Sequence, residues 1–223
     1  MAPRRALVTG ANRGIGEAVC AVLRHEGWEL IAAARKERDA KAAAQRHGAT
    51  PLTIDLADPA SVAKACAWLK GEPVDALVNN AGIYPQGGVL DADVADFREA
   101  LEVHLHGPLA LCRAVVPGMK QRRFGRIVNV SSGYGSFGEG LEGPAPYCIS
   151  KVALNALTVK LAQELPPSLK VNAVCPGWVR TRMGGGSADV AVEEAAENVA
   201  RYVLIGEDGP TGRFFREGHE VPW

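Results

Sequence analysis

The sequence predicts an α/β fold, in which a single doubly wound domain over residues 1–223 has helices on both faces of a mostly parallel, seven-stranded sheet. Three observations predict it. The chain has 223 residues, a length at which one α/β unit commonly stays undivided. Short β-rich runs alternate with segments of helical spacing. Several of these runs, such as Leu77-Val78 and Ile127-Val128, are apolar at successive positions, as in strands buried on both faces of a parallel sheet.

Seven runs have the composition of strands, and their order defines the expected elements. They are Arg5–Thr9, Glu29–Ala34, Leu52–Ile54, Val74–Asn79, Arg126–Val130, Val171–Cys175 and Arg213–Phe215. Helical spacing joins them, for example over Ile15–Gly27 and over Leu154–Leu165, where Pro166-Pro167 stops the helix. Parallel strands require long crossovers, which these helices supply. Ligands of such sheets bind at the carboxyl ends of the strands, so we expect the functional residues there.

The charge balance and the cysteines exclude several classes of function. Lysine plus arginine and aspartate plus glutamate number 25 each, so no net field favours nucleic acid or an anionic membrane as a partner. The apolar run that ends at Thr9 is too short for a signal peptide or a membrane span, which predicts a cytoplasmic protein. The cysteines contain no Cys-x-x-Cys pair, which predicts reduced, buried thiols and no metal site; they are Cys20, Cys66, Cys112, Cys148 and Cys175.

The first strand runs through a glycine-rich stretch directly into the first helix. Residues Thr9–Gly16 contain the spacing Gly-x-x-x-Gly-x-Gly. Glycine lets the backbone turn tightly and approach a pyrophosphate, and a helix N-terminus offers unpaired N–H groups. By itself such a loop can be only a tight turn. Its place between a strand and a helix favours a dinucleotide-binding (Rossmann) loop, formed by Gly10, Asn12, Arg13, Gly14, Ile15 and Gly16.

The second strand ends at Ala34 without the acidic residue that would bind the free ribose hydroxyl of NAD(H). Arg35 follows the strand instead, and Arg13 lies in the glycine-rich loop. Two guanidinium groups suit a doubly charged 2′-phosphate, so the sequence favours NADP(H) over NAD(H). In the alternative interpretation, Arg35 and Lys36 only cap an exposed strand end and Glu37 takes the ribose.

Polar side chains follow the fourth and fifth strands, at Asn79–Gly82 and Asn129–Ser132. Such residues often only satisfy the backbone groups of a turn. Tyr147 and Lys151 come next, and their i, i+4 spacing puts them on one face of a helix. A nearby ammonium stabilises a phenolate, which prepares a tyrosine for general acid or base catalysis. Alone, a Tyr-x-x-x-Lys pair is more often on the surface than at a site, so the combination carries the argument.

Taken in order, these motifs resemble the short-chain dehydrogenase/reductase (SDR) family. The set comprises Thr9–Gly16, Asn79–Gly82, Ser132, Tyr147-x-x-x-Lys151 and Pro176–Thr181. The resemblance covers nearly the whole chain, and the stretch 209–218 with Pro222-Trp223 is similar to the carbonyl-reductase-like members. It implies hydride transfer between NADP(H) and a carbonyl or alcohol substrate.

The resemblance also implies individual roles. Ser132 would hydrogen-bond the substrate carbonyl oxygen, and Tyr147 would protonate that oxygen as the general acid. Lys151 would bind the nicotinamide ribose and lower the pKa of Tyr147. The remaining cofactor contacts would be Asp55 and Leu56 beside the adenine, Asn80, Ala81 and Gly82 along the cofactor between its two ends, and Pro176, Val179 and Thr181 near the nicotinamide.

One position departs from the family. The family usually has Val-Asn-x-x-Gly in the helix after the fourth strand, where this chain has Val103–Gly107 with His104 in place of the asparagine. That asparagine holds a water that links the lysine to solvent. The His104 ring could hold the same water, relay the proton itself or displace the water. A metal site at His104 and His106 is not expected, because rings at i and i+2 of a helix point apart.

We therefore expect an NADPH-dependent reductase that converts a small ketone or aldehyde to an alcohol, assembled as a homodimer or homotetramer. The alternative is a non-catalytic NADP(H)-sensing module that regulates a partner protein. The glycine-rich stretch after Thr181 predicts an open or mobile substrate site. Four aromatic residues either line an apolar pocket or lie in the rim and core: Tyr84, Tyr134, Phe137 and Trp178.

Overall fold

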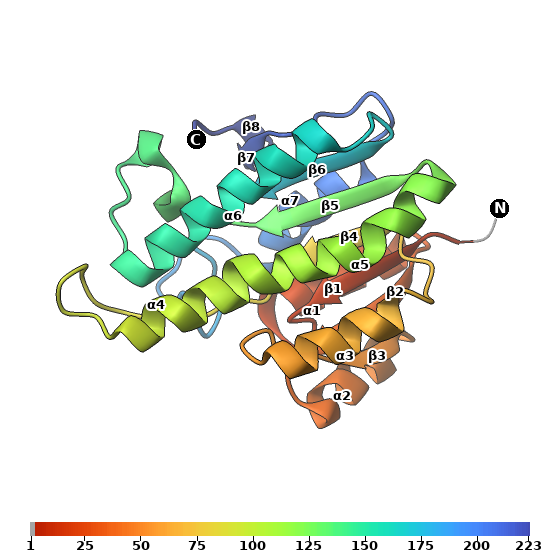
Figure 1. Ribbon diagram of the computed structural model, residues 1–223, viewed down its shortest axis with the longest axis horizontal. Coiled ribbons are helices and arrows are strands. Elements are labelled where there is room, and N and C mark those ends of the chain that lie inside the picture. Colours follow the sequence, from red (N-terminus) through yellow and green to blue (C-terminus); the bar gives the residue numbers. More distant parts are fainter. Residues whose placement is uncertain (1–2) are drawn as a thin grey trace.

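The structure is a computed structural model that describes residues 3–223, so residues 1 and 2 of the predicted domain lie outside it. An eight-stranded sheet forms its centre, with the strand order β3-β2-β1-β4-β5-β6-β7-β8 (Figure 1). The strands are β1 (Arg5–Thr9), β2 (Glu29–Ala34), β3 (Thr50–Thr53), β4 (Ala76–Asn79), β5 (Gly125–Val130), β6 (Leu169–Val174), β7 (Phe214–Arg216) and β8 (His219–Glu220). The helices are α1 (Gly14–His25), α2 (Glu37–His47), α3 (Pro59–Leu69), α4 (Val94–Leu101), α5 (Gly107–Arg122), α6 (Ala145–Glu164) and α7 (Val192–Leu204).

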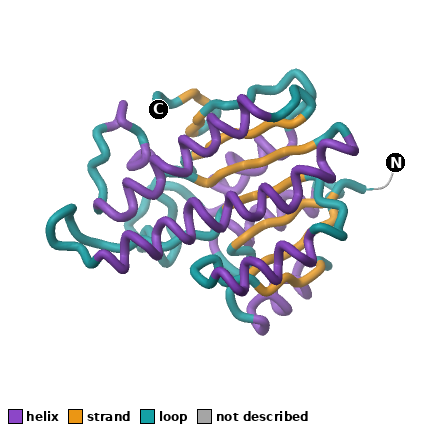
Figure 2. Tube along the Cα trace, viewed as in Figure 1, coloured by secondary structure: helices purple, strands orange, loops and turns teal. Residues whose placement is uncertain are grey.

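Helices cover each face of the sheet and enclose one apolar core on each (Figure 2). On one face, α1, α2 and α7 pack on the sheet through side chains such as Leu23 and Val203. On the other face, α3, α5 and α6 pack on it around Leu111 and Ile127. Each fully buried side chain of this size contributes about 1.5–3 kcal/mol, so both layers stabilise the sheet. The predicted doubly wound, three-layer fold is confirmed, and it leaves the carboxyl ends of the strands for a ligand.

The predicted strand positions agree with the structure apart from one added strand. β1 and β2 have the predicted bounds, and the ends of the other five predicted strands shift by one or two residues. The first seven strands pair in parallel, whereas β8 pairs antiparallel with β7. A tight turn joins the two, with positive φ at Glu217 (50°) and Gly218 (82°). Seven strands were predicted because a two-residue strand has no recognisable pattern of its own.

A buried arginine ties α7 to the sheet. Arg126 of β5 is fully buried, and its guanidinium donates to the carbonyls of Ile205 and Gly206, both at 3.0 Å. It also donates to the carbonyls of Gly125 (2.8 Å) and Ser168 (3.1 Å). Burial lowers its pKa to about 10, so the guanidinium stays charged at neutral pH. The interaction satisfies carbonyl groups just beyond the C-terminal end of α7.

A π-helical turn over Glu102–His106 joins α4 to α5. The helical spacing of Leu101, Leu105, Leu109 and Cys112 in the sequence predicts a regular helix that buries these four residues. Only Cys112 is buried, and the three leucines are half-buried. A π turn contains an extra residue, which rotates the helix face that follows it. Val103 and His104 therefore turn inward, while His106 is exposed.

The loop over residues 178–190 has its own hydrogen bonds. Val179 and Val190 form an isolated parallel bridge, and the Trp178 indole N–H donates to the Gly184 carbonyl at 2.8 Å. The glycine-rich stretch is thus more internally bonded than its composition predicted, because Trp178 and the bridge fold it back on itself. Its mobility stays a prediction. No helix within residues 3–223 has the length and apolar character needed to cross a membrane.

Candidate cofactor and catalytic site

The predicted site residues gather around one cleft of about 2230 Å³ at the carboxyl ends of the strands. Gly16 and His104 are the two that do not line it. Those that do are Gly10, Asn12, Arg13, Gly14, Ile15, Arg35, Asp55, Leu56, Asn80, Ala81, Gly82, Ser132, Tyr147, Lys151, Pro176, Val179 and Thr181. The parallel sheet brings them together because all its strand ends from β1 to β6 open on the same edge.

The glycine-rich loop needs glycine at two kinds of position. Gly10 and Gly14 have φ values of 66° and 53°, in the left-handed region that side chains disfavour. Gly16 lies beneath the loop, where a Cβ atom would clash with the Gly10 carbonyl oxygen and the Asn80 amide nitrogen. The third glycine therefore permits close packing of α1 under the loop, and the first two allow the tight turn and the approach of the backbone to a pyrophosphate.

Thr9 and Asn80 hold the glycine-rich loop against the next strand. The Asn80 amide donates to the Thr9 carbonyl at 2.8 Å, and the Thr9 hydroxyl accepts from the backbone N–H groups of Asn80 and Ala81, both at 3.0 Å. The same hydroxyl donates to the Val78 carbonyl at 3.2 Å. Sequence reasoning did not assign this role to Thr9, because it depends on β1 and β4 being neighbours in the sheet.

Two arginines mark the end of the cleft beside β2. The side chains of Arg13 and Arg35 are exposed, and neither has an ion-pair partner in the described part of the chain. Glu37, the alternative ribose ligand, instead pairs with Lys41 at 2.6 Å. That contact lowers the pKa of the Glu37 carboxyl, and Glu37 does not line the cleft. The geometry therefore favours an anion beside the two arginines over a hydroxyl bound by Glu37.

Tyr147 and Ser132 form the centre of the other end of the cleft. The Tyr147 ring is buried between Tyr84, whose ring centroid is 4.7 Å away, and His104, at 5.6 Å. Burial raises the pKa of the Tyr147 phenol, and hydrogen bonding to Ser132 opposes this rise. The Ser132 oxygen also accepts from the Tyr134 backbone N–H at 3.2 Å. Tyr147 therefore keeps its proton at neutral pH, as a general acid must.

Lys151 lies one helical turn after Tyr147, as predicted, and its ammonium group binds the backbone of β5. Its Nζ atom donates to the Val130 carbonyl at 2.8 Å and is 5.5 Å from the centroid of the Tyr147 ring. Burial lowers the pKa of Lys151 to about 7. The resemblance implied a lowered pKa for Tyr147, whereas burial raises it in this structure.

His104 is buried behind the cleft with both ring nitrogens engaged. The Ile83 backbone N–H donates to Nε2 at 3.1 Å, so the ring proton lies on Nδ1, which is 2.8 Å from the Ser150 oxygen. Ser150 in turn donates to the Tyr147 carbonyl at 2.7 Å. Burial and the nearby charge of Lys151 hold the pKa of His104 well below its usual value. His104 is therefore neutral, and it links the β4–α4 loop to helix α6.

His106 takes no part in the contacts of the buried His104. It is exposed and pairs with Glu102 at 2.8 Å, one turn earlier. Across residues 3–223, no three His, Cys, Asp or Glu side chains come together as a metal site requires.

Three of the four predicted aromatic residues line the cleft, namely Tyr84, Tyr134 and Trp178. Phe137 does not line the cleft and is 69 % exposed. Two charged residues that sequence reasoning missed, Glu139 and Arg216, also line it. They are separated by 77 positions in sequence, so only the tertiary structure reveals their pairing.

A glycine-rich loop before α1, together with serine, tyrosine and lysine side chains from later strand ends, defines a dinucleotide-binding α/β oxidoreductase. Comparison with known families agrees, since the model of the short chain dehydrogenase family matches residues 4–190. The chain belongs to this family, and it is carbonyl-reductase-like.

Two curated relatives and one solved structure illustrate how similar this chain is to known proteins. Oxidoreductase UcpA of Salmonella typhimurium is 36 % identical over 203 residues, which cover 88 % of this chain and 77 % of UcpA. The 3-oxoacyl-[acyl-carrier-protein] reductase FabG of Escherichia coli is 34 % identical over 189 residues, covering 82 % and 77 %. The NADPH-bound carbonyl reductase from chicken fatty liver superposes with a TM-score of 0.87 at 29 % identity, covering 99 % of this chain and 94 % of that one.

Proposed function

We propose that this protein is an NADPH-dependent reductase that converts a ketone or aldehyde to an alcohol. The observation that carries the proposal is the single cleft, which has the glycine-rich loop at one end and Ser132, Tyr147 and Lys151 at the other. This arrangement lets a dinucleotide lie along the strand ends with its reactive ring beside a proton donor. The bound cofactor supplies the hydride.

NADPH is the proposed cofactor because the end of the cleft beside β2 presents Arg13 and Arg35 with no carboxylate paired to either. Guanidinium groups bind a phosphate dianion with charge-assisted hydrogen bonds. Glu37 is held by Lys41, which argues against a ribose diol ligand there. The solved carbonyl reductase from chicken fatty liver also contains NADPH, which supports the same choice.

The residues at the other end of the cleft have separate roles toward the substrate and the cofactor. Ser132 donates its hydroxyl hydrogen to the carbonyl oxygen, because its own oxygen already accepts from Tyr134. Tyr147 gives its proton to the same oxygen as negative charge develops there. Lys151 would hold the nicotinamide ribose of the bound cofactor. Tyr84, Tyr134 and Trp178 exclude water and offer apolar surface to the substrate.

His104 acts as a positioning residue in this proposal. Its neutral ring joins Ile83 to Ser150, and Ser150 holds the carbonyl of Tyr147. No ring nitrogen is left to accept a proton from Lys151, so the imidazole does not relay protons in this tautomer. The family asparagine is replaced here by a side chain that fastens the catalytic helix.

The direct test is consumption of NADPH and NADH across a panel of aromatic ketones, aliphatic ketones, aldehydes and quinones. We expect turnover with NADPH and much weaker turnover with NADH. Tight NADPH binding without oxidation of NADPH by any carbonyl compound would overturn the proposal. That result would favour the alternative, a non-catalytic NADP(H)-sensing module, which no contact in the cleft supports. Cytoplasmic location and assembly into a homodimer or homotetramer stay predictions, which cell fractionation and light scattering would check.

A further inference from the structure

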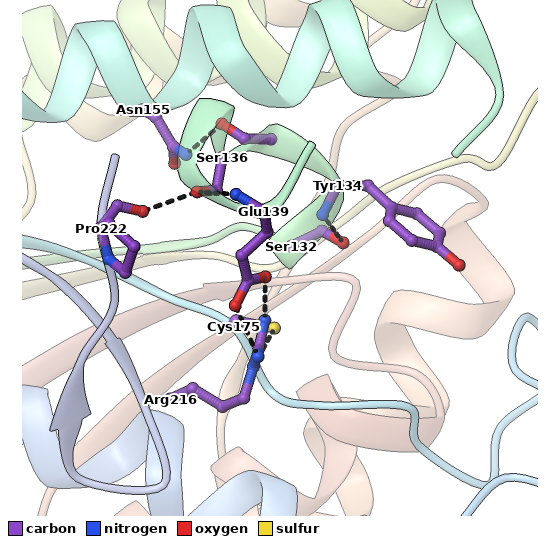
Figure 3. Close-up of polar contacts among 9 residues, drawn as sticks. Ser132, Tyr134, Ser136, Glu139, Asn155, Cys175, Arg216 and Pro222 are labelled. Carbon is purple, nitrogen blue, oxygen red and sulfur yellow. Dashed lines mark hydrogen bonds and ion pairs between the residues drawn. The ribbon is translucent and has the colours of Figure 1, made fainter. Parts of the chain in front are cut away.

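The loop that carries Ser132 is held from two sides (Figure 3). It begins at the end of β5 and forms two short 3₁₀ turns, Gly133–Gly135 and Phe137–Glu139. Helix α6 holds the first turn, because the Asn155 amide donates to the Gly135 carbonyl at 2.8 Å. A Cβ atom on Gly135 would lie only 2.8 Å from the Lys151 Cβ. On this side the loop is packed directly against the catalytic helix.

The second side is held by the last residue of β7 and, after it, by Pro222 and Trp223. Arg216, the last residue of β7, pairs with Glu139 through both terminal guanidinium nitrogens, Nη1 at 2.9 Å and Nη2 at 2.6 Å. Its Nε atom also donates to the Cys175 sulfur at 3.3 Å, just after β6. The Ser136 hydroxyl donates to the Pro222 carbonyl at 2.6 Å, and the Gly138 N–H donates to the Trp223 carbonyl at 3.0 Å. Figure 3 shows Arg216 reaching Glu139 and the Cys175 thiol together.

The ion pair lies against the backbone next to Ser132. A Cβ atom added to Gly133 would clash with the Glu139 carboxylate and with the Arg216 guanidinium. The pair therefore limits how the residue after Ser132 can move. Both side chains are about one-third exposed, and the paired groups form two parallel charge-assisted bonds, which makes this pair more specific than an ordinary surface pair.

We propose that Arg216, through its ion pair with Glu139, is a positioning residue that sets the place of the Ser132 hydroxyl in the cleft. The inference rests on the proposed function, because Ser132 matters only if it orients a carbonyl. Neither residue belongs to the predicted catalytic set. Arg216 acts through the loop backbone and not on the substrate, so its loss reduces turnover and leaves cofactor affinity intact.

The chain contains a matched control on the same hairpin. Arg213 pairs with Glu220 at 3.0 Å, and both side chains are more than half exposed. This pair does not line the cleft. We expect Arg216→Met to lower kcat for the best carbonyl substrate by at least about tenfold, with the Kd for NADPH within about twofold of wild type. Arg213→Met should leave kcat and Kd unchanged.

A double-mutant cycle with Ser132→Ala separates positioning from a general structural role. If Arg216 acts through Ser132, adding Arg216→Met to Ser132→Ala should lower kcat by less than about twofold further. The reversed pair Arg216→Glu with Glu139→Arg should recover part of the activity lost in Arg216→Glu alone. This second comparison keeps the inference testable if Arg216→Met folds poorly.

Three outcomes would overturn the inference. The first is an equal loss of kcat from Arg216→Met in the wild-type and Ser132→Ala backgrounds. The second is the same kinetics for Arg216→Met and Arg213→Met. The third is loss of NADPH binding together with turnover in every Arg216 variant, including the reversed pair. If the wild-type protein binds NADPH but reduces no carbonyl compound, the proposed function fails and this inference fails with it. Turnover by the wild type with normal Arg216 variants would overturn the inference alone.

Discussion

At the glycine-loop end of the cleft, the site comes mainly from the backbone of one short stretch, Thr9–Gly16, braced by Asn80. At the tyrosine end, it comes from side chains of several separate segments, among them Tyr84, Ser132 and Tyr147. The first end has open space and exposed arginines, whereas Tyr147, Lys151 and His104 at the second are buried. Burial changes the proton affinity of the groups at the tyrosine end, and exposed charge governs ligand choice at the glycine-loop end. Substitutions at the tyrosine end should therefore affect turnover, and those at the glycine-loop end should affect the choice of cofactor.

The largest effect is expected from Tyr147→Phe. Only the proton donor is lost, so kcat should fall about 10²- to 10⁴-fold while the Kd for NADPH stays nearly constant. Steady-state kinetics and NADPH fluorescence titration measure the two quantities separately. Retained turnover would remove Tyr147 from its proposed role, and lost NADPH binding would mean that the two ends are not independent.

Arg35→Asp tests the other end. The carboxylate repels a 2′-phosphate and accepts from a ribose hydroxyl, so the ratio of kcat/KM for NADPH to that for NADH should fall by at least about tenfold. Lys160→Asp makes the same charge change on the outer face of α6, where Lys160 pairs with Glu164, and serves as the control. An unchanged cofactor ratio in Arg35→Asp would move phosphate recognition to another residue.

Lys151 should give stability a pH dependence. Its pKa is about 7 in the folded protein against 10.5 for an ordinary lysine, so the unfolded chain binds more protons between these values. Burying the charged amine costs stability at and below the folded pKa of about 7, and this cost disappears as the pH rises to the ordinary pKa of 10.5. The free energy of unfolding of wild type relative to Lys151→Met should therefore rise by up to about 1.4 kcal/mol per pH unit above pH 7. Urea unfolding without added cofactor at several pH values measures it, and parallel curves for the two proteins would contradict it.

The smallest effect is expected from His104→Asn. The asparagine can restore one of the two hydrogen bonds of the ring, so kcat should stay within about tenfold and the pH profile should keep its shape. His106→Asn is the matched control, because His106 is exposed two residues away. A larger loss, more than about 1.4 kcal/mol in the barrier, would show that the imidazole has a proton-transfer role of its own.

Much of this site could be predicted without coordinates because its parts are local. The glycines between β1 and α1 indicate a tight turn by themselves, and the i, i+4 spacing of Tyr147 and Lys151 puts them on one helix face. The order of strands and crossovers then brings every motif to the same sheet edge. The family model supports the same interpretation of the chain.

Other features escaped prediction because they depend on neighbours that are distant in the sequence. The roles of Thr9 and Arg216 depend on which strands are adjacent, and β8 is too short to have a pattern. The π turn lies between α4 and α5 and packs against α6, and it changes which residues are buried. The pKa of Tyr147 was predicted to be lowered by Lys151, but burial raises it.

The sequence by itself determined the α/β class, the strand ends that carry chemistry and the residue types there, because periodicity and turn residues act over a few positions. Tertiary structure alone decided how His104 is bonded, which way the Lys151 ammonium is directed and what holds the Ser132 loop. Hydrogen bonds and desolvation act over a few ångströms in space, and the partners of Ser132's loop lie as many as 86 positions apart along the chain.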